Sequence, residues 1–365
     1  MTVFQVETIF DGVSWLRGMM PKNVWKEPDI ANAFILKRNG EVYLVDTGVG
    51  SAFRSALARF FAGRTYKSAT LINTHSHVDH VCNNDLLNEI DSREKRHLIH
   101  PAGVPYLDPY EWVKSILRLA GRAYTPFSFD TFPLSFLAVA GHMLERISAE
   151  AAYSLLARLS MRKFEPVRSR TPYLAPLSLR DRESLRIGVF AVRGWRLGTL
   201  LLLDDGAHSP DSIAVYDPQH RMLLLGDLTY EYDPLWPTGT YGRMIEHLEL
   251  YRALAVAGEV SILGDGHHHR LFHGTAEILP LLDDLIARHT RRRAAVVAIA
   301  TRRGTSSVDA IRRVLVAEDP EFAQMAAELE FPRAYCFTRA MIAVALAEMG
   351  KAEPSGSMIP KQRSA

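Results

Sequence analysis

The chain has 365 residues, of which 47% are hydrophobic and 23% charged, so it can bury a large core and does not belong to the disordered class. Its 43 basic and 41 acidic residues give a net charge of +2, which excludes a strong overall field for attracting nucleic acid or membrane surfaces. Two cysteines cannot form a disulfide framework, and neither a signal peptide nor a membrane span is recognisable, so we expect a soluble, cytoplasmic protein.

The first part of the chain predicts strands and one helix. Apolar and polar residues alternate around Asn39-Gly40, a dipeptide suited to a tight hairpin turn, and the second strand of this hairpin ends at Asp46. Residues 51–62 repeat apolar groups at helical spacing. The run ATLINTH then predicts a short buried strand that delivers a histidine cluster to its C-terminal end, where loops usually carry functional sites.

That cluster places four coordinating side chains within six consecutive positions. They are His75, His77, Asp79 and His80. A strand followed by a tight loop can direct His75 and His77 at one cation while the other two turn toward a neighbouring cation. Imidazole and carboxylate groups suit zinc and similar ions. A merely solvated histidine-rich loop would predict no further isolated ligands downstream, and such residues are present.

The segment from Pro101 to about Arg182 is rich in aromatic residues and leucine and has a pattern typical of helices, which predicts a helical insertion. Its large apolar side chains are interpreted in two ways. They form either an apolar lid that favours a lipophilic acyl group, or the insertion's own small core. These side chains are Trp112, Phe127, Phe129, Phe132, Phe136 and Leu137.

Strand patterns resume with LRIGVFAVRG, TLLLLDDG, SIAVYD, RMLLLGD and VSILGDG, and helical patterns follow beyond His273. We therefore predict an α+β domain over residues 1–275, with the helical insertion at about 101–182. A helical C-terminal appendage is predicted over 276–350, and a flexible tail over 351–365.

HSHVDH resembles the HxHxDH signature of the metallo-β-lactamase superfamily, and later motifs follow in that family's order. GAHSPDSIAVYD resembles the family's GHSPGS-type segment and places His208, LLLGDLTY places Asp227, and ILGDGHHH places His267. The DTG that begins at Asp46 matches the opening motif. The resemblance implies an αββα sandwich, here with a helical insertion and a helical, winged-helix-like C-terminal appendage.

The resemblance also implies seven ligands for two divalent metal ions, zinc first, with iron or manganese as alternatives. One ion is held by His75, His77 and His208, the second by Asp79, His80 and His267, and the Asp227 carboxylate bridges both. Asp46 is expected to support the ligand loop from behind.

Two positions depart from the family's pattern. Asp211 stands where the family usually has a glycine, so the turn after His208 is expected to be reshaped. The final motif offers His267, His268 and His269 in a row, and only the spacing from the preceding glycine selects the first.

The chemistry implied is hydrolysis. Two cations that share a water lower its pKa to about 7, so that a metal-bridging hydroxide can attack an electrophilic carbonyl or phosphorus. The catalytic candidates are Asp79, Asp227 and Tyr230, the last either as a donor to the developing oxyanion or as a packing residue. Cys82 is expected to be a buried packing residue rather than a reactive thiol.

The C-terminal sequence resembles the appendage found in a subgroup of this superfamily that contains thioesterases and glyoxalase II-like hydrolases. An activated acyl ester is therefore the favoured substrate, with a thioester first, either as a lipophilic small molecule or carrier-bound. The alternatives are a lactonase, an RNA phosphodiesterase, a mononuclear iron sulfur dioxygenase and an inactive binding module.

The RNA alternative requires that the cleft be lined by Arg291, Arg292, Arg293, Arg302, Arg303, Arg312 and Arg313. A solvated helix face is the commoner outcome for such residues, so nucleic acid is not the expected partner. The oligomeric state stays open.

Overall fold

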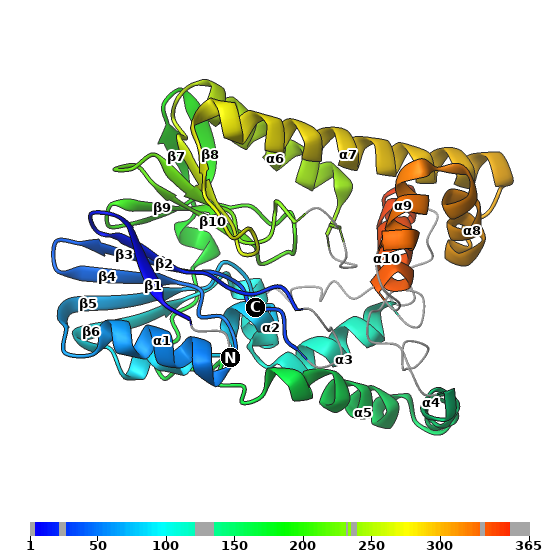
Figure 1. Cartoon of the computed structure of the whole chain (residues 1–365), viewed down its shortest axis with the longest axis horizontal. Helices are drawn as coiled ribbons and strands as arrows, with labels where there is room; N and C mark the ends of the chain where they lie inside the picture. The colour runs from blue at the N-terminus through cyan, green and yellow to red at the C-terminus, as the bar shows by residue number, and fades with distance from the viewer. Residues whose placement is uncertain are drawn as a thin grey trace. The chain divides into compact units, whose positions relative to one another are not determined.

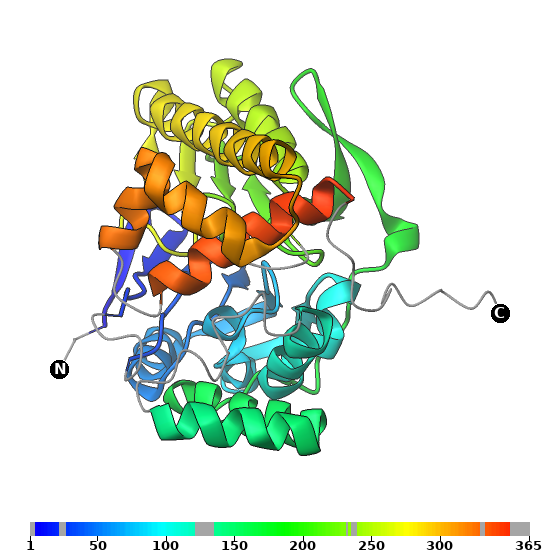
Figure 2. The same ribbon diagram turned by 90° about the vertical axis from the view of Figure 1, so that its right-hand side faces the viewer.

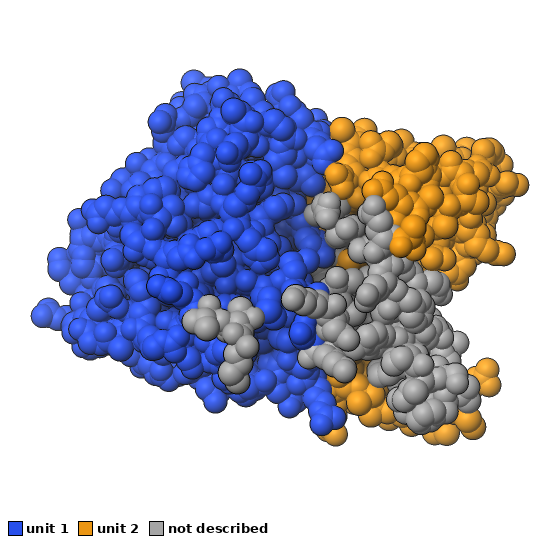
Figure 3. Space-filling model, in the orientation of Figure 1, with its two compact units in different colours: residues 1–109, 161–231, 246–286 blue, residues 110–160, 232–245, 287–365 orange. Residues whose placement is uncertain are grey.

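The computed structural model describes residues 4–21, 27–120, 135–230, 233–234, 239–328 and 333–350, which fall into two compact units. Unit 1 comprises residues 1–109, 161–231 and 246–286, and unit 2 comprises residues 110–160, 232–245 and 287–365 (Figure 3). The domain boundaries near 275 and 350 stay a prediction.

Unit 1 is built on two sheets, which have six and seven strands within the described residues (Figure 1). The first sheet has the order β1-β2-β3-β4-β5-β6, with β1 (Val6–Phe10), β2 (Val13–Leu16), β3 (Ala33–Arg38), β4 (Glu41–Val45), β5 (Thr65–Ile72) and β6 (Asp91–Leu98). The second has the order β13-β12-β11-β10-β9-β8-β7, with β7 (Glu183–Ile187), β8 (Phe190–Leu197), β9 (Leu200–Asp204), β10 (Ile213–Asp217), β11 (Met222–Leu224), β12 (Ile262–Gly264) and β13 (Phe272–His273).

The turn between β3 and β4 confirms the predicted hairpin. The two strands pair antiparallel, and the turn residues Asn39 and Gly40 have positive φ angles of 51° and 83°, which this dipeptide adopts readily. By contrast, β4, β5 and β6 pair in parallel. Their carboxyl ends therefore meet at the same edge of the sheet, and the loops that follow β4 and β5 lie next to each other.

Apolar side chains from both sheets form one core. Phe34 and Ile72 from the first sheet are buried together with Trp195, Leu202 and Val215 from the second. Each large side chain removed from water in this way contributes about 1.5–3 kcal/mol. The sheets thus pack face to face and fix the loops at their shared edge.

Helices cover the outer faces of this sandwich. Figure 1 shows α1 (Ser51–Phe61) against the first sheet, and α6 (Tyr241–Val256) on the side of the second. The buried residues of α1 are Phe53, Ala56, Leu57 and Phe61, whose spacing follows one helical face and matches the helix predicted over 51–62. Together with α7 (Gly274–Arg303), these elements confirm the predicted α+β fold class.

The insertion is helical only in part. Its described helices are η2 (Pro101–Leu107), α3 (Pro109–Ala120), α4 (Ser135–Ile147), α5 (Ala149–Met161), η5 (Arg162–Phe164) and η6 (Leu179–Asp181). Between the last two, the backbone of Tyr173 and Ala175 hydrogen-bonds to His97 of β6, because this edge strand has donors and acceptors to satisfy. Phe127, Phe129 and Phe132 lie outside the described residues.

Three helices follow α7 in the part of the C-terminal region that the structure describes. Figure 2 shows α8 (Val308–Glu318), α9 (Pro320–Glu328) and α10 (Arg333–Glu348) side by side, in orange and red, and each contacts the other two. The described elements of residues 304–350 are all helical, which confirms the helical part of the expectation. None of the described helices has the length and apolar character needed to cross a membrane.

Candidate metal centre

The histidine cluster begins where β5 ends at Ile72, between β4 and the edge strand β6 of the first sheet. Residues 73–77 leave the strand as a loop, and a single helical turn, α2 (Val78–Val81), carries Asp79 and His80. The sequence predicted only a loop here. The short helix places these two side chains in a different group of possible ligands from His75 and His77, although the rings of His75 and His80 are centred only 4.1 Å apart.

Asp46 supports this loop from the end of β4. Its backbone has a φ of 57°, and its carboxylate accepts hydrogen bonds from the backbone nitrogen of Thr74 at 2.9 Å and from the Thr74 hydroxyl at 2.7 Å. The second carboxylate oxygen also lies 2.9 Å from Nδ1 of His80. Because Nδ1 is engaged, Nε2 of His80 is the ring nitrogen that remains for a ligand on the opposite side.

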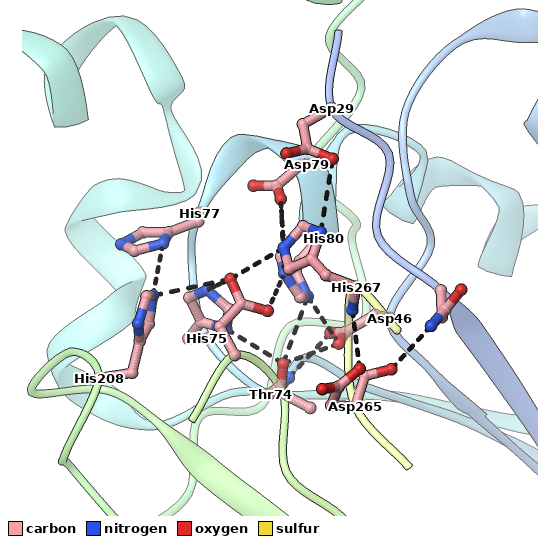
Figure 4. A network of polar contacts seen from close by, with 12 residues as sticks. Asp29, Asp46, Thr74, His75, His77, Asp79, His80, His208, Asp265 and His267 are labelled. Carbon is pink, nitrogen blue, oxygen red and sulfur yellow. Dashed lines mark hydrogen bonds and ion pairs between the residues drawn. The ribbon is translucent and has the colours of Figure 1, made fainter. Parts of the chain in front are cut away.

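The first candidate site combines the first two histidines with residues from the second sheet. The ligand atoms of His75, His77, His208 and Asp227 all lie within 4.8 Å of one another. His208 follows β9 and lies with its Nε2 3.0 Å from Nδ1 of His77, and Asp227 follows β11 with Oδ2 3.6 Å from Nε2 of His75. Figure 4 shows His75, His77 and His208 turned toward one another. All four side chains are buried.

The second candidate site shares Asp227 with the first. The ligand atoms of Asp79, His80, Asp227 and His267 also lie within 4.8 Å of one another. Oδ1 of Asp227 is 2.9 Å from Nε2 of His80, and Nε2 of His267 lies 3.3 Å from Oδ2 of Asp79 and 3.2 Å from Oδ2 of Asp227. The structure therefore brings all seven predicted residues together in two overlapping groups.

Both groups suit divalent cations. Nε2 of His75, Nε2 of His80 and Oδ1 of Asp227 are buried and make no hydrogen bond of regular geometry, although the last two atoms lie 2.9 Å apart. Buried polar atoms normally have partners, and lone pairs that converge without one fit a positive ion. Three histidines and a carboxylate in one group, and two histidines and two carboxylates in the other, are donor sets that zinc, iron and manganese accept.

The charges of the groups follow from their burial and their neighbours. Burial, helped by nearby imidazoles, lowers the pKa of His75 and, more strongly, that of His77. Burial also acts to raise the pKa of Asp227, but the histidines around it, His267 first, outweigh burial and hold this pKa well below its usual value. The charge of Asp227 outweighs burial at His80 and His267 and raises the pKa of both well above its usual value, so these two imidazoles must lose a proton before they bind a metal ion.

The structure distinguishes among the three consecutive histidines. His268 is held away from the two groups by Asp265, whose carboxylate contacts Nδ1 of His268 and the hydroxyl of Thr229. His269 is exposed. Only His267 faces the second group, and backbone nitrogens of His267 and His268 donate to the other oxygen of Asp265, which fixes the loop.

The sequence did not predict the role of two residues that contact this loop. The Asn32 amide donates to the backbone oxygens of Asp265 at 2.9 Å and His268 at 2.7 Å. Oδ1 of Asp29 lies 3.4 Å from Nδ1 of His267, so this carboxylate stands behind the ring as Asp46 stands behind His80 (Figure 4). No spacing in the sequence signals contacts between residues more than 230 positions apart.

The remaining candidates lie close to the second group or beneath it. The ring of Tyr230 is centred 5.4 Å from that of His267, and its role as an oxyanion donor stays a prediction. Cys82 is fully buried, and burial together with the charge of Asp79 raises the pKa of its thiol. A buried thiol that resists ionisation is a packing residue and a poor nucleophile.

Comparisons with known proteins agree with this geometry. The family model of the metallo-beta-lactamase superfamily matches residues 27–270, which contain all seven residues of the two groups. No curated protein sequence matches the chain.

Similar solved structures extend over almost the whole chain. A metallo-beta-lactamase family protein from Thermus thermophilus is 20% identical with a TM-score of 0.51, and the match covers 94% of this chain and 95% of that one. A beta-lactamase domain protein from Burkholderia ambifaria is 18% identical with a TM-score of 0.53, over 94% and 88% of the two chains. A stereoselective inverting sec-alkylsulfatase from a Pseudomonas species is 14% identical with a TM-score of 0.53, over 97% of this chain and 52% of that one. At such identities the likeness establishes the fold alone.

Proposed function

The protein belongs to the metallo-beta-lactamase superfamily, and from this premise we propose that it is a hydrolase of activated acyl esters that uses two divalent metal ions. A thioester is the favoured substrate. The observation that carries the proposal is that two groups of four side chains, the first buried and the second buried or partly buried, share the carboxylate of Asp227. A shared carboxylate of this kind is suited to holding two ions next to each other.

The residues have distinct tasks in this proposal. His75, His77 and His208 would hold one ion, Asp79, His80 and His267 would hold the other, and Asp227, which belongs to both groups, would be available to both. Bound together, such ions lower the pKa of water toward neutrality and stabilise negative charge on an oxygen. Tyr230 donates its hydroxyl hydrogen to the substrate oxygen that gains charge. Asp46 orients His80 through Nδ1, and the burial of His75, His77, His80, His208 and Asp227 restricts bulk water around them.

The helices α4 and α5 of the insertion, which belong to unit 2 except for the end of α5, carry exposed apolar side chains. Met143 and Ile147 on α4 are 60% and 81% exposed, and Leu155 and Leu159 on α5 are 40% and 42% exposed. Each pair is four residues apart and therefore lies on one face of its helix. Exposed apolar side chains grouped in this way favour an acyl chain or an apolar partner. Trp112, in contrast, is buried within unit 2 and supports the alternative that it belongs to the insertion's own core.

The arginine-rich segment gives little support to the RNA alternative. Arg291 and Arg292 both bind Glu321, Arg293 binds Glu348, and Arg302 and Arg303 contact Glu318. These five guanidinium groups are thus paired with carboxylates of the neighbouring helices. A nucleic-acid site needs basic groups that are available to phosphates.

The test combines metal analysis with a panel of substrates. We expect the purified protein to contain about two zinc-like ions per chain and to release free thiol from acyl-CoA esters. The panel also contains a lactone, an RNA oligonucleotide, a sec-alkyl sulfate, and a persulfide with oxygen uptake as the readout. His208→Ala should abolish the hydrolysis, whereas His273→Ala, at an exposed position, should not.

Each alternative predicts a different result. A single iron with oxygen consumption would replace the proposal by the dioxygenase reaction, and a protein that binds no metal would be an inactive module. Two ions with lactone or RNA cleavage and no thiol release would keep the metal centre and overturn the substrate class.

A further inference from the structure

One buried carboxylate connects the two loops that carry the first group of histidines. Oδ2 of Asp211 accepts a hydrogen bond of 2.8 Å from the backbone nitrogen of Ser76, and Oδ1 accepts one of 2.7 Å from the hydroxyl of Ser209. Ser76 stands between His75 and His77, and Ser209 follows His208. The Asp211 side chain thus contacts the immediate neighbours of all three histidines, and the residue is 4% exposed.

We propose that Asp211 is a positioning residue that holds the loop of His75 and His77 in register with the loop of His208. This inference rests on the proposed function, because these three histidines are the proposed ligands of one ion. Metal ligands must be held to within about 0.5 Å of their productive places, and hydrogen bonds to buried charged groups are among the stronger restraints. A glycine at this position would provide neither contact.

The loop of His208 is rigid where Asp211 acts on it. The hydroxyl of Ser212 lies 2.9 Å from the hydroxyl of Ser209. It also accepts a hydrogen bond of 3.0 Å from the backbone nitrogen of Ser209. The backbone nitrogen of Ile213 donates to the oxygen of Thr74 at 2.8 Å, which is the one backbone bond that joins the two loops directly in the described structure. Asp211 adds the contact on the far side of His75, at Ser76, so His75 is held on both sides and His77 follows directly after the second contact.

Gly103 supplies the space that Asp211 requires. A Cβ atom at position 103 would collide with Oδ2 of Asp211 and would lie 3.2 Å from its Cβ and 2.9 Å from Cδ1 of Ile99. Gly103→Ala therefore displaces the carboxylate without removing it. Two independent variants, at positions 103 and 211, disturb the same contact and can be combined.

The first measurement follows hydrogen exchange in the metal-free protein. Asp211→Ala should increase the exchange of the Ser76 amide, read in the peptide that spans residues 73–79, while α1 remains protected as in the unchanged protein. Asp211→Asn, which retains one carbonyl acceptor, should give an intermediate rate. If exchange at Ser76 does not change in Asp211→Ala, the carboxylate does not hold the loop and the inference is wrong.

The second measurement is the affinity for zinc, obtained by competition with a chromophoric chelator. Asp211→Ala and Gly103→Ala should each lower the affinity for one of the two zinc ions by about 10- to 100-fold and leave the affinity for the other unchanged. In the double variant the loss should be smaller than the sum of the two single losses, because both act on one contact. Gly242→Ala is the matched control, since nothing lies within 4 Å of a Cβ at that exposed position.

The two measurements separate the inference from the proposed function. Increased exchange with unchanged zinc affinity, or loss of thermal stability alone, would show that Asp211 is merely structural and would overturn the positioning role. If the unchanged protein binds no zinc, the proposed function fails, and the positioning role fails with it even where the exchange result shows that Asp211 joins the loops.

Discussion

The backbone lies close to Asp227 and His80 at Gly266, the residue before His267. A Cβ atom there would collide with Oδ1 of Asp227 and would lie 2.8 Å from Cε1 of His80. We expect Gly266→Ala to displace these two ligands and to weaken zinc binding by about 10-fold or more. Chelator competition measures the effect, with Gly242→Ala as the control. Unchanged zinc affinity would mean that these side chains move aside without cost and that the groups are less confined than the distances indicate.

A second residue beneath the site makes stability depend on pH. His97 is fully buried, its Nε2 lies 2.7 Å from Oδ1 of Asn73, and burial lowers its pKa from 6.5 to about 4. Between these two values the unfolded chain binds a proton that the folded protein does not. Stability therefore falls as the pH is lowered from about 6.5 to about 4, by at most about 3 kcal/mol from this residue.

The test is the free energy of unfolding measured between pH 7 and pH 4.5 for His97→Gln, whose amide does not titrate. Its stability should decline less steeply with falling pH than that of the unchanged protein. His273→Gln, at an exposed position, should show the original slope. An equal slope for both variants would exclude His97 as a source of the acid sensitivity.

Residues of the site differ in how far the sequence could predict them. The seven candidate ligands lie in short motifs whose order along the chain is informative, and the structure brings all seven together. Asp29, Asn32 and the role of Asp211 could not be predicted in this way. Each acts through a contact with a residue more than 130 positions away, and such contacts exist only after the two sheets have packed.

Among the strands, β3 and β10 are joined by a buried ion pair. Nη2 of Arg38 lies 2.5 Å from Oδ2 of Asp217, and their side chains are 6% and 1% exposed. Without Arg38, the buried carboxylate of Asp217 keeps its contacts with Nδ1 of His220 at 2.8 Å and the backbone nitrogen of Gln219 at 3.1 Å, but it loses its permanently charged partner. We expect Arg38→Ala to lower the free energy of unfolding by about 3–5 kcal/mol.

Chemical denaturation measures this loss, and a matched exposed pair provides the control. Arg196 and Glu183 on neighbouring strands are 59% and 51% exposed, so Arg196→Ala should cost less than about 1 kcal/mol. Equal losses for the two variants would contradict the view that burial makes the first pair important.

The elements predicted from sequence are those with a periodic apolar face. α1 buries four residues at helical spacing, and the β3–β4 hairpin alternates around a turn of suitable residues. β6 was not predicted, because its sequence DSREKRHL buries only its last two residues and therefore lacks an alternating pattern. The bonds that hold it come from the neighbouring β5, and sequence periodicity does not report them.

At the scale of the whole molecule, the two ligand groups connect the two sheets of unit 1. The loops after β4 and β5 supply Asp46 and the HSHVDH cluster, and the loops after β9, β11 and β12 supply His208, Asp227 and His267. Metal ions bound at these groups would cross-link elements that are otherwise held by the apolar core. The fold and the site should therefore stabilise each other.

Removal of metal tests this connection. An ion that binds only the folded protein stabilises it by about 4 kcal/mol when its free concentration is 1,000 times its dissociation constant. Without ions, the carboxylates of Asp79 and Asp227 remain buried near one another. We expect a chelator to lower the midpoint of thermal unfolding by several degrees, and added zinc to restore it in proportion to the logarithm of its concentration. The double variant His75→Ala/His208→Ala should show a much smaller response to zinc. An unfolding midpoint that is insensitive to the chelator in protein shown to contain zinc would mean that the ions do not link the sheets, and that the apolar core alone holds the site in place.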